Sequence, residues 1–358
     1  MKKTLALVLA AVMLLSLLSA CKSSADETPT VDPAETEQTN TPEETTPAEE
    51  QTPEEPQPSQ EELDQAAADN VAALIDAIYV QSRTDETDAQ CEAAKAAWDA
   101  LTDAQKELVE GDEASPDYFG LDTGDASLDD ARNQDEIGEN ELLVVSFGTS
   151  YNDSRVADIK GIEDALQAAF PDWSVRRAFT AQIIINHVQA RDGEKIDNMD
   201  QALDRAVANG VKNLVVQPTH LMHGAEYDEM CEAIEQYKDK FESVSIAEPL
   251  LGEVGSDATV INADKEAVAK AITAAAVADS GFESLDTAKD AGTAFVFMGH
   301  GTAHVAKVTY SQMQTQMQNL GYENVFIGTV EASRKRPPAR LSSRPSRLRA
   351  IPMSCCAR

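Results

Sequence analysis

Residues 214–224 read LVVQPTHLMHG and residues 295–304 read FVFMGHGTAH, and these two stretches decide the fold. Each is a short apolar run that is typical of a buried strand, followed at once by a loop that contains two histidines. They hold four of the five histidines in the chain: His220, His223, His300 and His304. Because the carboxyl ends of parallel strands open onto one shared crevice, imidazoles from both loops are predicted to face a common ligand.

Strand-like and helix-like segments alternate around these two stretches from residue 141 onward. Strands are predicted at residues 142–147, 174–179, 213–216, 243–247, 294–298 and 325–330. Amphipathic segments separate most of them, at residues 153–170, 199–208, 225–240, 264–278 and 305–320. This alternation predicts an α/β domain with parallel sheets over residues 141–331.

The N-terminus carries the features of an export signal. Lys2 and Lys3 precede an apolar run over residues 4–18, and Leu18-Ser19-Ala20 leads into Cys21. The run is too short for an ordinary membrane span. It resembles a bacterial lipoprotein signal, with residues 1–21 ending at Cys21 as the lipidation site. We therefore expect an exported, membrane-anchored lipoprotein on the periplasmic or cell-surface side; the alternative is an ordinary signal peptide that contains a cysteine.

Three further segments lie between the signal and the α/β domain. Residues 22–60 are rich in Thr, Pro and Glu and are predicted to form a disordered tether. Residues 61–110 have a helical period, marked by Val71, Leu74, Ile75 and Ile78, and predict a small helical module that acts as a spacer or docking unit. Residues 111–140 are acidic and predict a linker.

The last segment, residues 332–358, differs from the rest of the chain. From Ser333 to Arg358 it contains many arginines and prolines and no Asp or Glu. We interpret it as an aberrant tail produced by truncation or a reading-frame shift. The functional alternative is an anchor to an anionic surface.

The formal net charge of −34 excludes some partners. A nucleic-acid partner would need a basic face, so none is expected. No P-loop appears in the sequence, so no nucleotide is expected as a cofactor.

The strand-end residues offer ligands for a divalent metal. His220 and His300 follow their strands directly, and Glu248 follows the strand between them. Imidazole and carboxylate are common ligands of first-row metals. A His–Glu–His set is therefore predicted as an open metal site, whereas His223 and His304 are interpreted as neighbours of the ligands and His187 as a residue without a role. From spacing alone, a metal enzyme, a metal-binding protein and a hydrolase remain open.

Several ordered motifs over residues 141–331 resemble the anaerobic (class II) sirohydrochlorin cobaltochelatase family. They are VVSFGTS at Val144–Ser150, RAFT at Arg177–Thr180, VQPTH at Val216–His220, GAEY at Gly224–Tyr227 and FMGHG at Phe297–Gly301. The resemblance implies two doubly wound parallel-sheet lobes facing a cleft, with the second lobe incomplete here because the arginine-rich tail replaces its last strands.

The resemblance also implies a function, the insertion of Co²⁺ (or Fe²⁺) as substrate metal into sirohydrochlorin or a related tetrapyrrole. Carried over by motif, His220, Glu248 and His300 hold the metal, and His220 also accepts pyrrole protons. Gly148, Thr149, Ser150 and Glu226 are expected to contact the substrate, with backbone N–H groups receiving its carboxylates. A homo-oligomer is compatible with this prediction. The alternative is a non-enzymatic exported lipoprotein that binds a tetrapyrrole, haem or metal.

Overall fold

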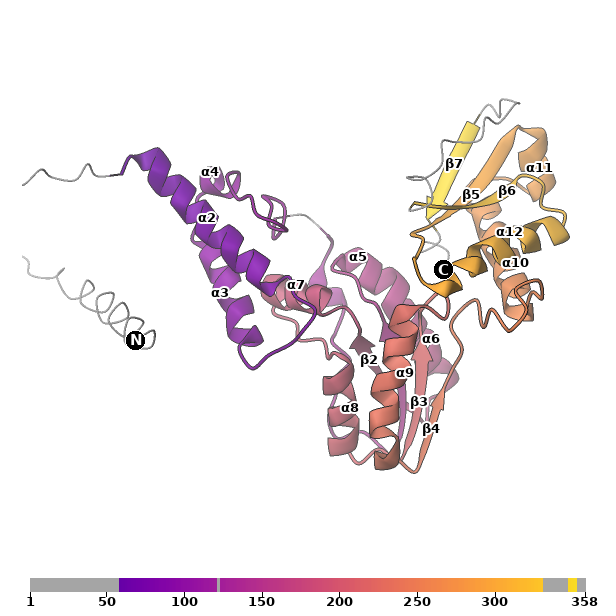
Figure 1. The fold of residues 1–358 in the computed structure, drawn as a ribbon, viewed down its shortest axis with the longest axis horizontal. Helices are drawn as coiled ribbons and strands as arrows, with labels where there is room; N and C mark the ends of the chain where they lie inside the picture. Colours follow the sequence, from indigo (N-terminus) through magenta and orange to yellow (C-terminus); the bar gives the residue numbers. More distant parts are fainter. Residues whose placement is uncertain (1–57, 121–122, 331–346, 353–358) are drawn as a thin grey trace, which may run out of the picture. The chain divides into compact units, whose positions relative to one another are not determined.

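The computed structural model describes residues 58–120, 123–330 and 347–352 (Figure 1). The predicted signal, Cys21 and nearly all of the predicted tether lie outside the described residues, so these remain predictions. Within the described ranges, no helix is both long enough and apolar enough to cross a membrane.

The helical module is confirmed over the first described residues. It consists of α2 (Gln60–Ile78), α3 (Thr87–Asp99) and the short α4 (Asp103–Lys106). Ser59 and Thr102 cap α2 and α4 through capping boxes, in which the side chain of each accepts a backbone N–H three residues on. The helices share one apolar core, which includes Val71, Ile75 and Trp98.

This module packs on helix α7 (Gln182–Asp192) of the α/β domain. The buried amide of Asn186 donates to the carbonyl of Ile78 (2.8 Å), and the Cys91 thiol lies 3.6 Å from the carbonyl of Asn186. Gln189 donates to Asp88 across the same interface (2.7 Å). Ala190 also belongs to the core of the module, so the module and α7 share one packed interior.

Two aromatic residues from the predicted linker, Tyr118 and Phe119, are buried in the core of the module. Tyr118 stacks on the His187 ring of α7, with the ring centroids 4.2 Å apart. The described part of the predicted linker thus contributes to packing. Because the segment is acidic overall, its composition does not predict that Tyr118 and Phe119 are buried.

We predict that His187 makes this interface sensitive to acid. Burial and the charge of Arg191 lower the pKa of His187 to about 4. The unfolded chain, with a histidine pKa near 6.5, binds the proton more readily, so stability is present above pH 6.5 and falls as the pH drops toward 4. A shift of this size corresponds to about 3 kcal/mol of unfolding free energy.

Urea unfolding of the wild type and of His187→Phe at several pH values measures this effect. The phenylalanine keeps a ring against Tyr118 but cannot be protonated. The difference between the two chains should therefore change by up to about 3 kcal/mol from pH 6.5 to pH 4. Other groups, such as Glu141, whose pKa burial raises to about 7, cancel in that difference. Parallel pH profiles would contradict the prediction.

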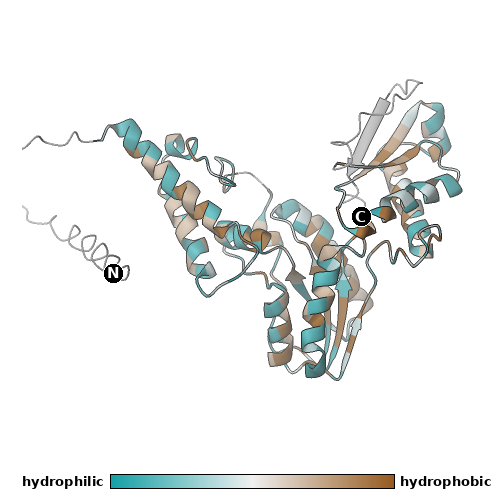
Figure 2. Ribbon diagram, viewed as in Figure 1, coloured by the Kyte–Doolittle hydropathy of each residue, from teal (hydrophilic) through white to brown (hydrophobic). Residues whose placement is uncertain are grey.

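The first sheet of the α/β domain has four parallel strands in the order β2-β1-β3-β4. Their ranges are β1 Asn140–Ser146, β2 Ser174–Phe179, β3 Asn213–Pro218 and β4 Ser243–Ile246. Alternate residues of β1 enter different cores. Leu143 and Val145 pack with residues of α8 (Met199–Ala208) and α9 (Ala225–Tyr237), whereas Leu142 and Val144 belong to a cluster flanked by Leu166 of α6 (Lys160–Ala169). Figure 2 shows that α8 and α9 carry both hydrophobic and hydrophilic residues, as expected for helices that cover a sheet.

A turn of helix and a π-helical segment, α5 (Asn152–Ser154) and η2 (Arg155–Ile159), lead into α6. Here a group of buried ion pairs joins three parts of the chain. The Arg177 guanidinium of β2 contacts Glu163 of α6 and Asp129 of the predicted linker, each at 2.8 Å. Arg155 also contacts Asp129 (3.0 Å). These contacts fix the predicted linker against the sheet.

The second sheet has three parallel strands in the order β6-β5-β7. They are β5 (Thr293–Gly299), β6 (Val325–Thr329) and β7 (Arg347–Pro352). Helices α10 (Ala263–Asp279), α11 (Leu285–Asp290) and α12 (Val308–Asn319) complete this lobe, and Phe295, Phe297 and Met313 lie in its core. The predicted α/β class with two parallel sheets is confirmed. Strand β7 lies within the arginine-rich tail, where no strand was predicted.

Candidate functional site

The loop after β3 is fixed beside the end of β1. The Thr219 hydroxyl donates to the Ser146 hydroxyl (2.8 Å), and the Thr219 N–H donates to the carbonyl of Val145 (2.8 Å). In the order β2-β1-β3-β4 the chain runs outward in both directions from β1 and β3. Ligands of doubly wound sheets bind at such a switch point, outside the carboxyl ends of the strands. His220 is the next residue after this anchored threonine.

Both ring nitrogens of His220 are buried, and neither has a hydrogen-bond partner among the residues that the structure describes. A buried imidazole without a partner is costly, because its polar atoms have lost water and gained nothing in return. Burial lowers the pKa of His220, and the nearby charge of Glu226 opposes this effect. The ring is therefore neutral at pH 7 and has a free lone pair for a metal or a proton.

The predicted substrate loop, residues 148–150, follows β1 at the same edge of the sheet. Gly148 has φ +99°, and the Phe179 ring occupies the space that a Cβ would need. Arg191 donates to the carbonyl of Ser150 (2.7 Å). Glu226, also predicted to contact substrate, lies exposed in the first turn of α9. The structure thus positions these residues around the switch point, and their contact with a substrate stays a prediction.

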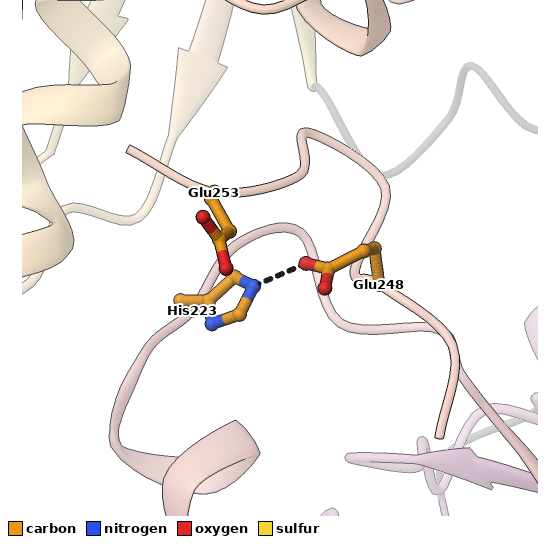
Figure 3. Close-up of side chains that lie close together, drawn as sticks. All are labelled: His223, Glu248 and Glu253. Atoms are coloured by element: carbon orange, nitrogen blue, oxygen red, sulfur yellow. Dashed lines mark hydrogen bonds and ion pairs between the residues drawn. The ribbon is translucent and has the colours of Figure 1, made fainter. Parts of the chain in front are cut away.

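Glu248 pairs with His223, and not with His220 or His300 as predicted. It follows β4, and its Oε2 lies 2.5 Å from Nε2 of His223 (Figure 3). Glu253 completes a group in which one ligand atom from each residue lies within 4.8 Å of the others. Among the residues that the structure describes, this group contains Glu248 but neither His220 nor His300. The set of His220, Glu248 and His300 therefore stays a prediction.

The second histidine loop follows β5. His300 is exposed, and its Nδ1 lies 3.2 Å from the carbonyl oxygen of Gly301. His304 Nε2 lies 3.4 Å from Oδ2 of Asp228 in α9. His304 thus connects the loop after β5 with the helix that follows the His220 loop.

Sequence reasoning missed His223 and Glu253 as members of this group. His223 lies three residues beyond the strand-end histidine, so the strand-end argument predicts it only as a neighbour of the ligands. Glu253 does not directly follow a strand, so the strand-end argument could not find it. The signal that was available is the spacing Glu248–Pro249–Leu250–Leu251–Gly252–Glu253, in which a glycine lets the chain turn between two carboxylates.

The fold is that of a doubly wound α/β protein, and histidines at the strand ends offer possible metal ligands. The comparisons with known proteins agree with this fold. The model of the family described as Cobalt chelatase (CbiK) matches residues 140–336. The chain belongs to this family.

Two curated relatives support the same family. A sirohydrochlorin cobaltochelatase of Salmonella typhimurium is 31% identical over 191 residues, which cover 53% of this chain and 65% of that protein. Sirohydrochlorin cobaltochelatase CbiKC of Nitratidesulfovibrio vulgaris is 27% identical over 212 residues, 58% of this chain and 68% of that protein. The chain thus spans about two thirds of the length of these relatives.

Proposed function

We propose that this chain inserts a divalent metal, Co²⁺ or Fe²⁺, into sirohydrochlorin or a related tetrapyrrole. Membership of the cobalt chelatase family and likeness to two proteins named sirohydrochlorin cobaltochelatase support the reaction class and cobalt as the substrate metal. The one observation on this chain that carries the proposal concerns His220 at the switch point of the sheet: its two ring nitrogens are buried and have no partner within the described part of the chain.

The proposed roles follow from the chemistry of insertion. A metal dication replaces two pyrrole protons, so the site must hold the metal weakly and accept protons. The neutral imidazole of His220 serves both needs, because its lone pair first binds the metal and, as the metal passes into the macrocycle, takes one of the two pyrrole protons, while the other passes to solvent. Glu248 and His300 are the proposed additional ligands, and a carboxylate also offsets the charge of the cation.

The assay is metal insertion by the purified full-length chain. Sirohydrochlorin and Co²⁺ are mixed with and without the protein, and the absorbance of the macrocycle is followed with time. We expect the protein to increase the rate clearly above the uncatalysed rate. A protein that binds the tetrapyrrole but leaves the rate of metallation unchanged would contradict the proposal and would favour the exported binding protein instead.

A further inference from the structure

The group of His223, Glu248 and Glu253 lies on the solvent side of the switch point. The His223 side chain is 26% exposed and that of Glu248 is 55% exposed. Figure 3 shows the Glu253 carboxylate above the imidazole ring and the Glu248 carboxylate to its right. A hydrated cation can therefore reach all three side chains.

The segment that carries Glu253 is held in place by buried groups. The Lys265 ammonium, whose residue is fully buried, donates to the carbonyls of Leu251 (2.8 Å) and Glu253 (2.9 Å). Asn262 donates to the same two carbonyls, each at 3.0 Å. Gly252 has φ +60°, and the side chains of Asp264 and Asn262 leave no room for a Cβ there. The turn between Glu248 and Glu253 is thus held in one conformation by hydrogen bonds and packing.

The His223 loop is tied to that segment. The N–H groups of Leu250 and Leu251 donate to the carbonyls of His220 and Leu221, each at 3.0 Å. The His223 ring packs on the Tyr227 ring, with the centroids 4.3 Å apart. The backbones that carry the three side chains therefore form one connected unit.

A pocket of about 480 Å³ adjoins the group. Its polar lining includes His223, Asp228, Glu253 and His304, and no lysine or arginine is found among the described residues that line it. Carboxylates without a nearby cationic side chain in the lining concentrate cations from solution.

We propose that His223, Glu248 and Glu253 form a loading site that captures the divalent metal from solvent before it reaches His220. Imidazole and carboxylate together suit borderline first-row dications. Two ligands that each lie 2.0–2.2 Å from one ion are at most about 4.4 Å apart, close to the 4.8 Å limit within which this group falls. On binding, the proton of His223 Nε2 moves by way of solvent to Nδ1, so the imidazole stays neutral, and the hydrogen bond to Glu248 is replaced by a bond from each side chain to the metal.

The loading site deepens the proposed function and rests on it for the second step, the transfer. Glu248 is shared between the loading site and the proposed insertion ligands. His223 lies three residues beyond His220 on the same loop. A metal held by Glu248 can therefore pass to His220 by exchanging its other ligands, without leaving the protein.

Equilibrium binding of Co²⁺ alone to the full-length chain tests the capture step, by titration calorimetry and by the visible spectrum of bound Co²⁺. The variants are His223→Ala and Glu253→Gln, with Glu283→Gln as control, because Glu283 is exposed and lies outside this group. We expect each of the two variants to raise the Kd for Co²⁺ at least about tenfold, which corresponds to about 1.4 kcal/mol. The control should match the wild type.

The same variants are assayed for insertion at several Co²⁺ concentrations. Loss of the loading site should raise the KM for Co²⁺, with a much smaller effect on kcat. Co²⁺ affinities of both variants within twofold of the wild type would overturn the loading site, even if the wild-type chain inserts metal. Tight binding that depends on His223 and Glu253, in a chain that metallates no tetrapyrrole, would support capture and overturn the proposed function instead.

Discussion

Replacing His220 with alanine is expected to lower the rate of cobalt insertion by about 100- to 10,000-fold, the range typical of a lost acid–base group. The variant removes the proposed proton acceptor and one proposed metal ligand together. Among the described residues neither ring nitrogen has a hydrogen-bond partner, so the change breaks no hydrogen bond of the ring there. Stability should therefore change little relative to activity. Stopped-flow or steady-state absorbance of the macrocycle measures the rate, and thermal unfolding measures the stability.

His220→Ala also separates catalysis from capture. Its Co²⁺ affinity at the loading site should remain near that of the wild type, since His223, Glu248 and Glu253 are all retained. A His220→Ala chain that folds, binds tetrapyrrole and inserts cobalt at the wild-type rate would exclude His220 as the base.

Replacing Arg177 with methionine is expected to destabilise the α/β domain by about 3–5 kcal/mol. The guanidinium pairs with Glu163 and Asp129, and the side chains of all three residues are at most 1% exposed. Burial raises the pKa of Glu163 in spite of its arginine partners. For Asp129, burial acts in the same direction, but the hydrogen bonds and charges of Arg177 and Arg155 outweigh it and lower the pKa. Methionine leaves both carboxylates without their main partner.

Urea unfolding monitored by circular dichroism measures the loss. Lys270→Met is the matched control, because Lys270 forms an exposed pair with Glu266 on α10 and should contribute less than about 1 kcal/mol. Adding Glu163→Gln and Asp129→Asn to Arg177→Met should recover part of the loss, since neutral amides cost less to bury. A loss below about 1 kcal/mol for Arg177→Met would show that the buried pairs do not hold the predicted linker.

Much of the fold could be predicted because its signals are local. The apolar runs at β1, β3 and β5 and the periodic segments at α6 and α9 follow directly from residue patterns. The role of the predicted linker could not be anticipated in this way. Its anchors are two aromatic residues and one aspartate whose partners lie far away in sequence, and a charged composition gives no sign of such pairs. Strand β7 was not predicted, because the short alternation Arg347-Leu348-Arg349-Ala350 lies in an arginine- and proline-rich segment and its pairing depends on β5.

Sequence reasoning could propose site residues only where they directly follow strands. It proposed His220, Glu248 and His300 on the expectation that parallel strands bring their ends to one edge. In the structure β3 and β4 belong to the first sheet and β5 to the second, and the set stays a prediction. Which of the loop side chains come into contact depends on the conformation of the loops, which the sequence pattern does not predict. The turn at Gly252 and the contacts of Lys265 bring Glu253 close to His223. The hydrogen bonds of Lys265 join residues up to fourteen positions apart, and no periodic sequence pattern predicts them.

Product formed per molecule of protein is the most direct measure of the central claim, that this chain is a metal chelatase acting through His220. The full-length chain is mixed with a large excess of Co²⁺ and sirohydrochlorin, and cobalt–tetrapyrrole is quantified from its absorbance after separation from protein. We expect many equivalents of free product for the wild type and close to the uncatalysed amount for His220→Ala. One equivalent or less of tetrapyrrole, retained on the protein and the same for both chains, would contradict it.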